Sequence, residues 1–283
     1  MSEIIKVRCL KHIYPDKTEV SVCGLDFIVK KGNRVVILGP NGMGKTTLIG
    51  HILGLLKPLE GEVEVFGKNP SKEFKDIRKK IGVVFQNVDE QIIGPTVRDD
   101  IAFTLRNEGQ DNKTLERKVE EIAAIIGITA LLDKIPHYLS GGQKKKVALA
   151  GAISMLPELL IFDEPFDGLD PKSKKEMISL INDLNQTKGI TTIITTHDIN
   201  IVPYIADVIY ILNDGHIIKS GTPQEIFSEP EVLQQAHLEA PILVQLFERL
   251  REQGVKVNIP INIDEAEQMI YGLLKRTQKA DNR

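Results

Sequence analysis

The residues best suited to chemistry form a glycine-rich segment, Gly39-Pro-Asn-Gly-Met-Gly-Lys-Thr-Thr47, with the spacing G-x-x-x-x-G-K-[ST]. Glycines at these positions let backbone N–H groups close around phosphate oxygens, and the N-terminus of a following helix adds positive potential. Lys45 would reach the β- and γ-phosphates of a nucleotide, and the Thr46 hydroxyl would ligate Mg²⁺. A glycine-rich turn without a ligand is disfavoured, because the segment follows an apolar run at 34–38 and opens a helical pattern at 45–55.

A pair of carboxylates forms the second candidate group. The apolar run Leu159–Phe162 ends in Asp163 and Glu164. The carboxyl ends of buried strands are where α/β proteins bind ligands. We expect Asp163 to hold Mg²⁺ through water and Glu164 to polarise an attacking water. Without the phosphate loop, a solvated acidic turn would be an equally good interpretation of this pair. The presence of the phosphate loop in the same sequence favours the functional interpretation.

The third candidate is Leu139-Ser-Gly-Gly-Gln143, which precedes a helical pattern from Lys144 to about Met155. Ser140 and Gln143 have the spacing of a capping box. The two glycines between them leave backbone N–H groups bare at a helix start, which suits an anion. We interpret the run Lys144–Lys146 as a solvated helix face rather than a ligand site.

These groups need a scaffold, and the alternation of apolar runs with helical patterns predicts an α/β fold whose sheet has a parallel core. Residues 4–10 and 20–30 predict early strands in an antiparallel layer, and 96–155 predict an inserted helical subdomain. Four runs are typical of strands buried on both faces, at 34–38, 159–162, 190–195 and 208–212.

The tail differs from the rest of the chain. Apolar residues fall at helical spacing over 242–250 and over 266–274. Between them 255–263 alternates, and Pro260 makes it an edge strand or an extended linker. We therefore predict a nucleotide-binding domain over 1–224 and a small accessory domain over 225–283.

Composition limits the alternatives. Apolar residues make up 42% and charged residues 27%, which is usual for a globular protein and excludes disorder. The net charge of −3 speaks against a nucleic-acid partner. Cys9 and Cys23 do not suggest a disulfide framework, so a reducing cytosol is the simplest compartment. Met1–Lys6 does not read as a signal peptide, and no apolar run approaches the roughly 20 residues that span a bilayer.

The three motifs occur in the order and spacing of ABC-type ATPases, and the resemblance covers about residues 4–225. Further positions match. Gln86, after the run 83–85, resembles the Q-loop glutamine; Gly168–Asp170 resembles the D-loop; His197 resembles the switch histidine; and Tyr14 resembles the aromatic residue that stacks on adenine. The resemblance implies a P-loop NTPase core with an antiparallel β layer, a helical subdomain, and ATP and Mg²⁺ as ligands.

The resemblance also implies a role for each matching residue. It assigns catalytic roles to Lys45, Gln86, Glu164 and His197, and Mg²⁺ ligation to Thr46, Gln86 and Asp163. The nucleotide-binding residues that it implies are Tyr14, Gly39, Pro40, Asn41, Gly42, Met43, Gly44, Lys45, Thr46, Thr47, Ser140, Gly141, Gly142 and Gln143.

Such ATPases work as head-to-tail pairs. Each ATP is held between the phosphate loop of one copy and the LSGGQ segment of the other, and hydrolysis releases the two halves. Both half-sites are intact here, which allows a homodimer or a heterodimer with a paralogue. Phe166 and Asp167 depart from the family, which usually has Thr and then Ser or Ala at positions that approach the partner. Asp167 adds negative charge near the Mg²⁺ site.

Other features of the sequence indicate which branch of the ABC family the chain resembles. One LSGGQ segment disfavours tandem translation factors, the interval from Lys45 to Ser140 has no coiled-coil heptads, and there are no fused membrane helices. The stretches Phe85–Gln91 and Pro95–Val97 resemble energy-coupling-factor importers, which include cobalt and nickel importers. The run Leu139–Gly151 and the tail with Ala240-Pro241 resemble the same group.

In that group a transmembrane subunit inserts coupling helices into the Q-loop groove, and a separate membrane protein binds the substrate. The resemblance therefore implies a peripheral protein on the cytoplasmic face of the cell membrane. Asp89 and Glu90 either meet a basic residue on those helices or form a solvated loop. Cobalt, nickel and several vitamins stay open as cargo, because five histidines, His12, His51, His137, His216 and His237, show no metal-ligand spacing. The alternatives are the ATPase of an efflux or other uptake system, and a soluble regulatory or repair ATPase.

Overall fold

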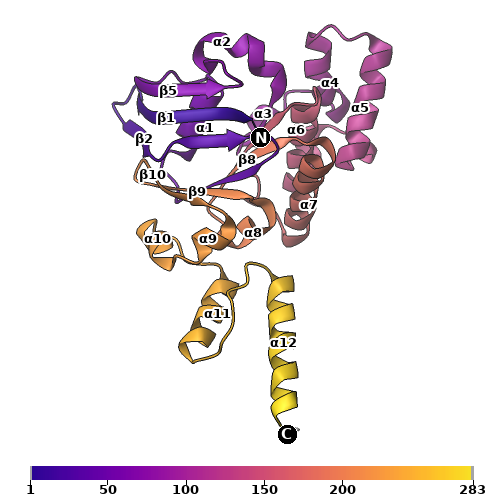
Figure 1. Cartoon of the computed structure of the whole chain (residues 1–283). Helices are drawn as coiled ribbons and strands as arrows, with labels where there is room; N and C mark the ends of the chain where they lie inside the picture. Colours follow the sequence, from indigo (N-terminus) through magenta and orange to yellow (C-terminus); the bar gives the residue numbers. More distant parts are fainter. Residues whose placement is uncertain (1, 282–283) are drawn as a thin grey trace.

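The computed structural model describes residues 2–281, and within them the strands form one sheet of ten strands (Figure 1). Its order is β3-β1-β2-β10-β9-β4-β8-β7-β6, and β5 pairs with β1 beside this path. The strands are β1 (Glu3–Ile13), β2 (Glu19–Gly24), β3 (Phe27–Lys30), β4 (Arg34–Leu38), β5 (Glu60–Val65), β6 (Ile81–Val84), β7 (Leu159–Asp163), β8 (Thr191–Thr196), β9 (Val208–Asn213) and β10 (His216–Gly221).

The helices cover the sheet and extend the chain beyond it (Figure 1). They are α1 (Lys45–Ile52), α2 (Pro70–Ile77), α3 (Val88–Gln91), α4 (Val97–Asn107), α5 (Asn112–Ile126), α6 (Gly141–Ile153), α7 (Pro171–Lys188), α8 (Val202–Ile205), α9 (Pro223–Phe227), α10 (Pro230–Gln235), α11 (Ile242–Glu252) and α12 (Ile263–Asp281). No helix in the described part of the chain is both long and apolar enough to cross a bilayer.

The parallel core consists of β6, β7, β8, β4 and β9, which pair in parallel in that order. Every residue of β7 and β8 is buried, as the continuous apolar runs predict for strands covered on both faces. Because these strands are adjacent and parallel, their carboxyl ends meet at one edge of the sheet. Leu38, Asp163 and Thr196 end β4, β7 and β8 there, so the phosphate loop, the two acids and His197 emerge side by side.

The antiparallel layer predicted from residues 4–10 and 20–30 is confirmed, since β1 pairs antiparallel with β2, β3 and β5. Strand β5 was not predicted. Its sequence, Glu-Gly-Glu-Val-Glu-Val, buries only Val63 and Val65 and exposes its acids. Two apolar residues give too weak a period-2 signal to identify a strand from sequence alone.

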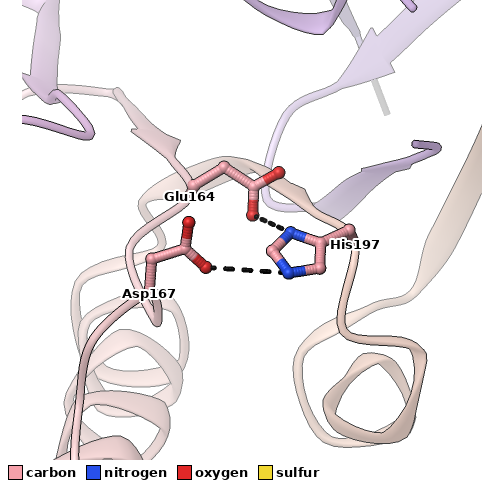
Figure 2. A group of neighbouring side chains, drawn as sticks. All are labelled: Glu164, Asp167 and His197. Atoms are coloured by element: carbon pink, nitrogen blue, oxygen red, sulfur yellow. Dashed lines mark hydrogen bonds and ion pairs between the residues drawn. The ribbon is translucent and has the colours of Figure 1, made fainter. Parts of the chain in front are cut away.

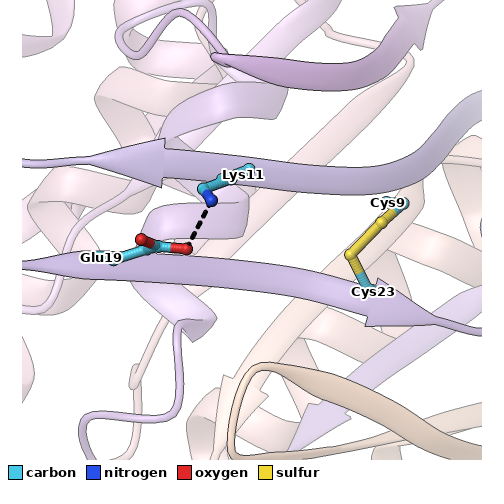
Figure 3. The surroundings of a disulfide bond; sticks show 4 residues. All are labelled: Cys9, Lys11, Glu19 and Cys23. Atoms are coloured by element: carbon cyan, nitrogen blue, oxygen red, sulfur yellow. Dashed lines mark ion pairs between the residues drawn. A yellow bond between two sulfur atoms is a disulfide. The ribbon is translucent and has the colours of Figure 1, made fainter.

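A disulfide joins Cys9 of β1 to Cys23 of β2, close to the ion pair of Lys11 with Glu19 (Figure 3). The interpretation that the two cysteines do not suggest a disulfide is therefore wrong. The antiparallel register pairs Leu10 with Val22, which brings the neighbouring cysteines opposite one another with Cα atoms 4.0 Å apart. A sequence separation of 14 residues does not reveal this register.

The helical subdomain predicted over 96–155 contains α4, α5 and α6, which contact one another at one side of the sheet (Figure 1). Each helix turns one apolar stripe inward. Ile101, Val119 and Val147 are fully buried in a core cluster that they share with Val36 and Phe162 of the sheet. The subdomain is therefore packed onto the α/β core.

The C-terminal segment begins on the core and then leaves it. Phe227, Leu233 and Val244 are fully buried, and they belong to the same apolar cluster as the parallel strands. Beyond α11 the described residues of 255–262 form no strand, in agreement with an extended linker, and α12 runs away from the sheet (Figure 1). A domain boundary at 224/225 stays a prediction.

Candidate nucleotide-binding site

The phosphate loop connects β4 to α1 and depends on glycine at two positions. Gly44 immediately precedes α1 and has a φ of +97°, a left-handed conformation that L-residues with a side chain rarely adopt. A Cβ atom at Gly39 would lie 2.3 Å from the carbonyl oxygen of Leu212 on β9. The loop therefore owes its shape to glycine, and the structure agrees with the sequence motif.

Lys45 points back across this loop. Its Nζ donates hydrogen bonds to the carbonyl oxygens of Gly39 and Pro40 and lies 3.0 Å from Oε1 of Glu164. Both charged side chains are only 6% exposed. Removing one partner of such a buried pair leaves an uncompensated charge, which is strongly destabilising. The predicted phosphate-binding cation and the predicted general base thus neutralise one another in this state.

Glu164 follows β7 in a strained conformation. Its φ is +47°, in the left-handed region that costs a non-glycine residue of order 1 kcal/mol or more. Its backbone N–H donates to Oγ1 of Thr195, and its Oε2 lies 3.1 Å from Nδ1 of His197 (Figure 2). In this conformation the carboxylate lies between Lys45 of the phosphate loop and His197.

Hard oxygen donors gather around Asp163. Its Oδ2 accepts from Oγ1 of Thr46 at 3.1 Å, and its Oδ1 accepts from Oγ1 of Thr195 at 2.6 Å. Thr46, Asp163 and Gln86 line one open cavity. Carboxylate, hydroxyl and amide oxygens are the ligands that Mg²⁺ prefers, so the residues present fit the cation. Sequence reasoning missed Thr195 of β8, because its place opposite Asp163 of β7 depends on the strand register and leaves no signal in the sequence.

Gln86 and His197 both contact Asp167. Nε2 of Gln86 donates to Oδ2 of Asp167 at 3.3 Å, and Nε2 of His197 lies 4.0 Å from Oδ1 of the same carboxylate (Figure 2). The structure thus brings together Lys45, Thr46, Gln86, Asp163, Glu164 and His197, as the sequence predicts. Tyr14 lies beside them, since its hydroxyl is 2.9 Å from Oγ1 of Thr47 and its ring meets His12 edge-on.

The LSGGQ segment lies elsewhere. The capping box is confirmed. The Ser140 hydroxyl accepts a hydrogen bond from the backbone N–H of Gln143, and the Gln143 side chain accepts one from the backbone N–H of Ser140. Ser140 and Gly142 line a pocket with Asp170 and Ser173. None of these residues lines the cavity of Thr46 and Asp163. Within one chain, therefore, the structure does not bring the two predicted halves of the nucleotide site to the same cavity.

The interpretation of Lys144–Lys146 as a solvated face is wrong for Lys145. Its side chain is buried, and Nζ donates to the carbonyl oxygens of Pro165 and Asp167 at 2.8 and 2.6 Å. Residues four apart share a helix face, so Lys145 lies on the buried face of Leu149. Burial lowers the pKa of Lys145, against the opposing influence of the Asp167 and Glu164 carboxylates.

The two flanking lysines form ion pairs within the chain. Lys144 pairs with Asp89 at 2.6 Å, and Lys146 pairs with Glu176 at the same distance. Glu90 accepts a hydrogen bond from Asn87. Phe166 is buried in the apolar core, so its side chain is not available to a partner subunit.

Comparisons with known proteins agree with this geometry. The family model described as "ABC transporter" matches residues 22–167, and a model described as an AAA domain matches 134–202. The energy-coupling factor transporter ATP-binding protein EcfA of Methanocaldococcus jannaschii is 44% identical over 279 residues, which cover 96% of this chain and 98% of that protein. Its namesake in Methanococcus maripaludis is 42% identical, with 96% and 99% covered.

Two solved structures resemble the fold. CbiO1 of Clostridium perfringens, described as part of the ABC transporter complex CbiONQ, is 38% identical, has a TM-score of 0.75, and covers 88% of this chain and 100% of its own. An ATP-binding cassette solved as a dimer with ADP and phosphate is 28% identical, has a TM-score of 0.69, and covers 77% and 98%. The chain is therefore an ATP-binding, ATP-hydrolysing subunit of the ABC transporter family, and it belongs with the ATP-binding proteins of energy-coupling factor transporters.

Proposed function

We propose that this chain energises an energy-coupling-factor importer of a transition-metal ion, cobalt or nickel, or of a vitamin, through ATP-driven closure of a dimer coupled to a transmembrane partner. One observation carries the proposal. The Ser140 pocket and the Thr46 cavity share no lining residue, so neither half-site surrounds a nucleotide within one chain. A second copy, or a paralogue, placed head to tail would supply Ser140–Gln143 opposite each phosphate loop. The dimeric ADP-bound relative supports this arrangement.

The roles of the residues follow from their positions. Lys45 and the N–H groups before α1 bind the phosphates, and Tyr14 stacks on adenine. Thr46, Gln86 and Asp163 hold Mg²⁺, which when bound neutralises charge on the β- and γ-oxygens. Glu164 polarises the attacking water and takes its proton, and His197, 3.1 Å from Glu164, holds that carboxylate in place.

A groove between the helical subdomain and the sheet suits the transmembrane partner. It is lined by residues of β6, α4 and α6, among them Val83, Phe103 and Ala152, and by Met155, which follows α6. Phe103 is 45% exposed and Ile93, at the same groove, is 62% exposed. Large apolar side chains exposed beside one groove are typical of an interaction site. We assign this groove to a coupling helix of the membrane subunit, which would hold the chain at the cytoplasmic face of the membrane.

The acids Asp89 and Glu90 lie beside this region, and Asp89 is already paired with Lys144 of the same chain. A basic residue on the coupling helix would therefore compete with Lys144 for Asp89. The groove rather than this pair carries the proposed contact.

Affinity purification of the tagged chain from gently solubilised native membranes, with mass spectrometry, tests the proposal. We expect a polytopic scaffold and one or more separate substrate-binding membrane proteins, whose identity names the cargo. Phe103→Glu should remove these proteins, whereas Leu59→Glu, at a side chain 62% exposed and outside the groove, should retain them. Recovery of soluble partners alone would favour the regulatory or repair alternative.

A further inference from the structure

Asp167 contacts several residues of the site, although the family usually has a small residue, Ser or Ala, at this position. Its carboxylate accepts a hydrogen bond from Gln86 through Oδ2, and Oδ1 lies 4.0 Å from Nε2 of His197. Its backbone carbonyl accepts from Lys145, and its backbone N–H donates to the carbonyl of Glu164. Asp167 therefore contacts Gln86, His197 and Lys145 of α6 at once, and Figure 2 shows its carboxylate beside the ring of His197.

The contacts continue as one polar chain through the site. From Asp167 they pass to His197, from His197 to Glu164 at 3.1 Å, and from Glu164 to Lys45 at 3.0 Å. This series of contacts begins at Gln86, which lines the cavity of Thr46 and Asp163, and it ends at the ammonium group of Lys45 in the phosphate loop. In this state Gln86, His197 and Lys45 each have a carboxylate of the same protein as a partner.

The charge of Asp167 sets it against the ligand. A carboxylate at this position has the same sign as a γ-phosphate, and it competes with the phosphate for the amide donor of Gln86 and, when the ring is charged, for His197. The side chain of Asp167 is 39% exposed, so water screens the repulsion without removing it.

We propose that Asp167 is a positioning residue that ties Gln86 to His197 in the nucleotide-free cassette and must release both of them when ATP enters. The inference rests on the proposed roles of Gln86 and His197. Its consequence is that the chain needs a higher ATP concentration to close its site than it would with a small neutral residue at position 167.

Two variants of the full-length chain separate the charge from the hydrogen bond. Asp167→Asn removes the charge and keeps an amide oxygen that can accept from Gln86, and Asp167→Ser removes both. We expect the dissociation constant of N-methylanthraniloyl-ATP to fall about two- to fivefold for Asp167→Asn, the range of partly exposed ion pairs, and further for Asp167→Ser. The gain in nucleotide affinity should be smaller at high salt, because salt then screens the repulsion between Asp167 and the phosphate in the parent protein as well.

A matched control removes an acid far from the site. Glu239→Gln, at an exposed residue between α10 and α11, should leave the dissociation constant unchanged. Gln86→Ala supplies the second half of a double-mutant cycle. If Asp167 acts through Gln86, the gain from Asp167→Ser is smaller in the Gln86→Ala background than in the parent chain.

An unchanged or weaker affinity in both Asp167 variants would overturn the inference. So would a drop in melting temperature with no gain in affinity, which a merely structural role of Asp167 in its loop predicts. The binding measurement requires neither hydrolysis nor a membrane partner. It therefore tests the role of Asp167 even if the importer proposal is wrong. Parent protein that fails to bind the nucleotide at all would instead overturn the assigned nucleotide site, and this inference with it.

Discussion

The ammonium of Lys45 lies 3.0 Å from Oε1 of Glu164, and both side chains are only 6% exposed. The cation proposed to bind phosphate thus holds the carboxylate proposed to activate water. If Lys45 binds phosphate and Glu164 activates water, as proposed, ATP exchanges this pair for two new contacts, Lys45 with phosphate oxygens and Glu164 with a water. On these proposed roles the ion pair keeps the base neutralised in the nucleotide-free cassette, and the arriving phosphate would free it.

Substitution of Glu164 tests the general base. We expect Glu164→Gln to lower ATP hydrolysis by two or more orders of magnitude, because an amide cannot take the proton of the attacking water. Lys45 and the Mg²⁺ ligands remain, so the variant should accumulate as an ATP-bound dimer. Light scattering after size-exclusion chromatography, with ATP and Mg²⁺, measures the dimer. Hydrolysis at the parent rate would assign the base to another residue.

Substitution of Lys45 tests the phosphate contact. Lys45→Met keeps much of the side-chain volume and removes the charge, and we expect nucleotide binding to be lost in equilibrium dialysis. Because the change leaves Glu164 buried without its cation, the melting temperature should also fall. The double variant Lys45→Met, Glu164→Gln should recover stability but not binding. Nucleotide affinity equal to that of the parent would contradict the assignment.

Buried His51 makes the stability depend on pH. Its side chain is 1% exposed, and burial, with a smaller influence from His12, lowers its pKa from 6.5 to about 4. Above pH 6.5 both the native and the unfolded chain hold His51 neutral. As the pH falls from 6.5 to about 4 the unfolded chain gains a proton that the native chain does not, so stability is lost over this window.

Between pH 7 and pH 5 the loss from this residue should be about 2 kcal/mol. Urea unfolding of the parent and of His51→Leu at both pH values measures it, because other titrating groups are common to the two proteins. The free energy of unfolding of His51→Leu should fall by less than that of the parent. Equal slopes for the two proteins would show that His51 is not neutral in the native state.

The disulfide between Cys9 and Cys23 makes a chemical prediction. Alkylation of the denatured, unreduced protein should label neither cysteine, and prior reduction should expose both. In the chain-entropy description a loop of 14 residues contributes about 3 kcal/mol to stability. Reduction, or the double variant Cys9→Ser, Cys23→Ser, should therefore lower the free energy of unfolding by about this amount. Two free thiols in the freshly purified protein would contradict the bond.

Helix α12 exposes apolar residues that suit a second copy of the chain. Ile263, Ile270 and Leu274 recur at helical spacing and are 64%, 43% and 57% exposed. We expect Ile270→Glu with Leu274→Glu to weaken the nucleotide-free dimer in analytical ultracentrifugation and to leave ATP binding unchanged. Gln268→Glu, also exposed on α12, is the control. An unaltered association constant would remove α12 from the interface.

Much of the site was predictable because its parts are local in sequence. A phosphate loop needs glycines, a lysine and a threonine within nine residues, and the apolar run before Asp163 marks a strand buried on both faces. Parallel strands end at one edge of a sheet, so Asp163 was expected beside the phosphate loop, whereas His197 was placed there only by the resemblance to ABC-type ATPases. The boundaries of β4, β7 and β9 follow the apolar runs to within one residue, since full burial on both faces leaves a continuous signal.

What the sequence did not determine depends on register and on which face of an element meets its neighbour. The pairing of Cys9 with Cys23 follows from the alignment of β1 with β2, and the role of Thr195 follows from its place opposite Asp163. In the sequence Lys145 is indistinguishable from its two neighbouring lysines. Only the packing of α6 shows that its side chain is on the buried face of the helix. The family, the fold class and the candidate catalytic residues could thus be predicted from the sequence, whereas only the folded protein shows that Lys45 meets Glu164 and that Asp167 meets Gln86 and His197. The reason is that side-chain contacts between distant segments depend on strand alignment and helix rotation, to which local sequence patterns are insensitive.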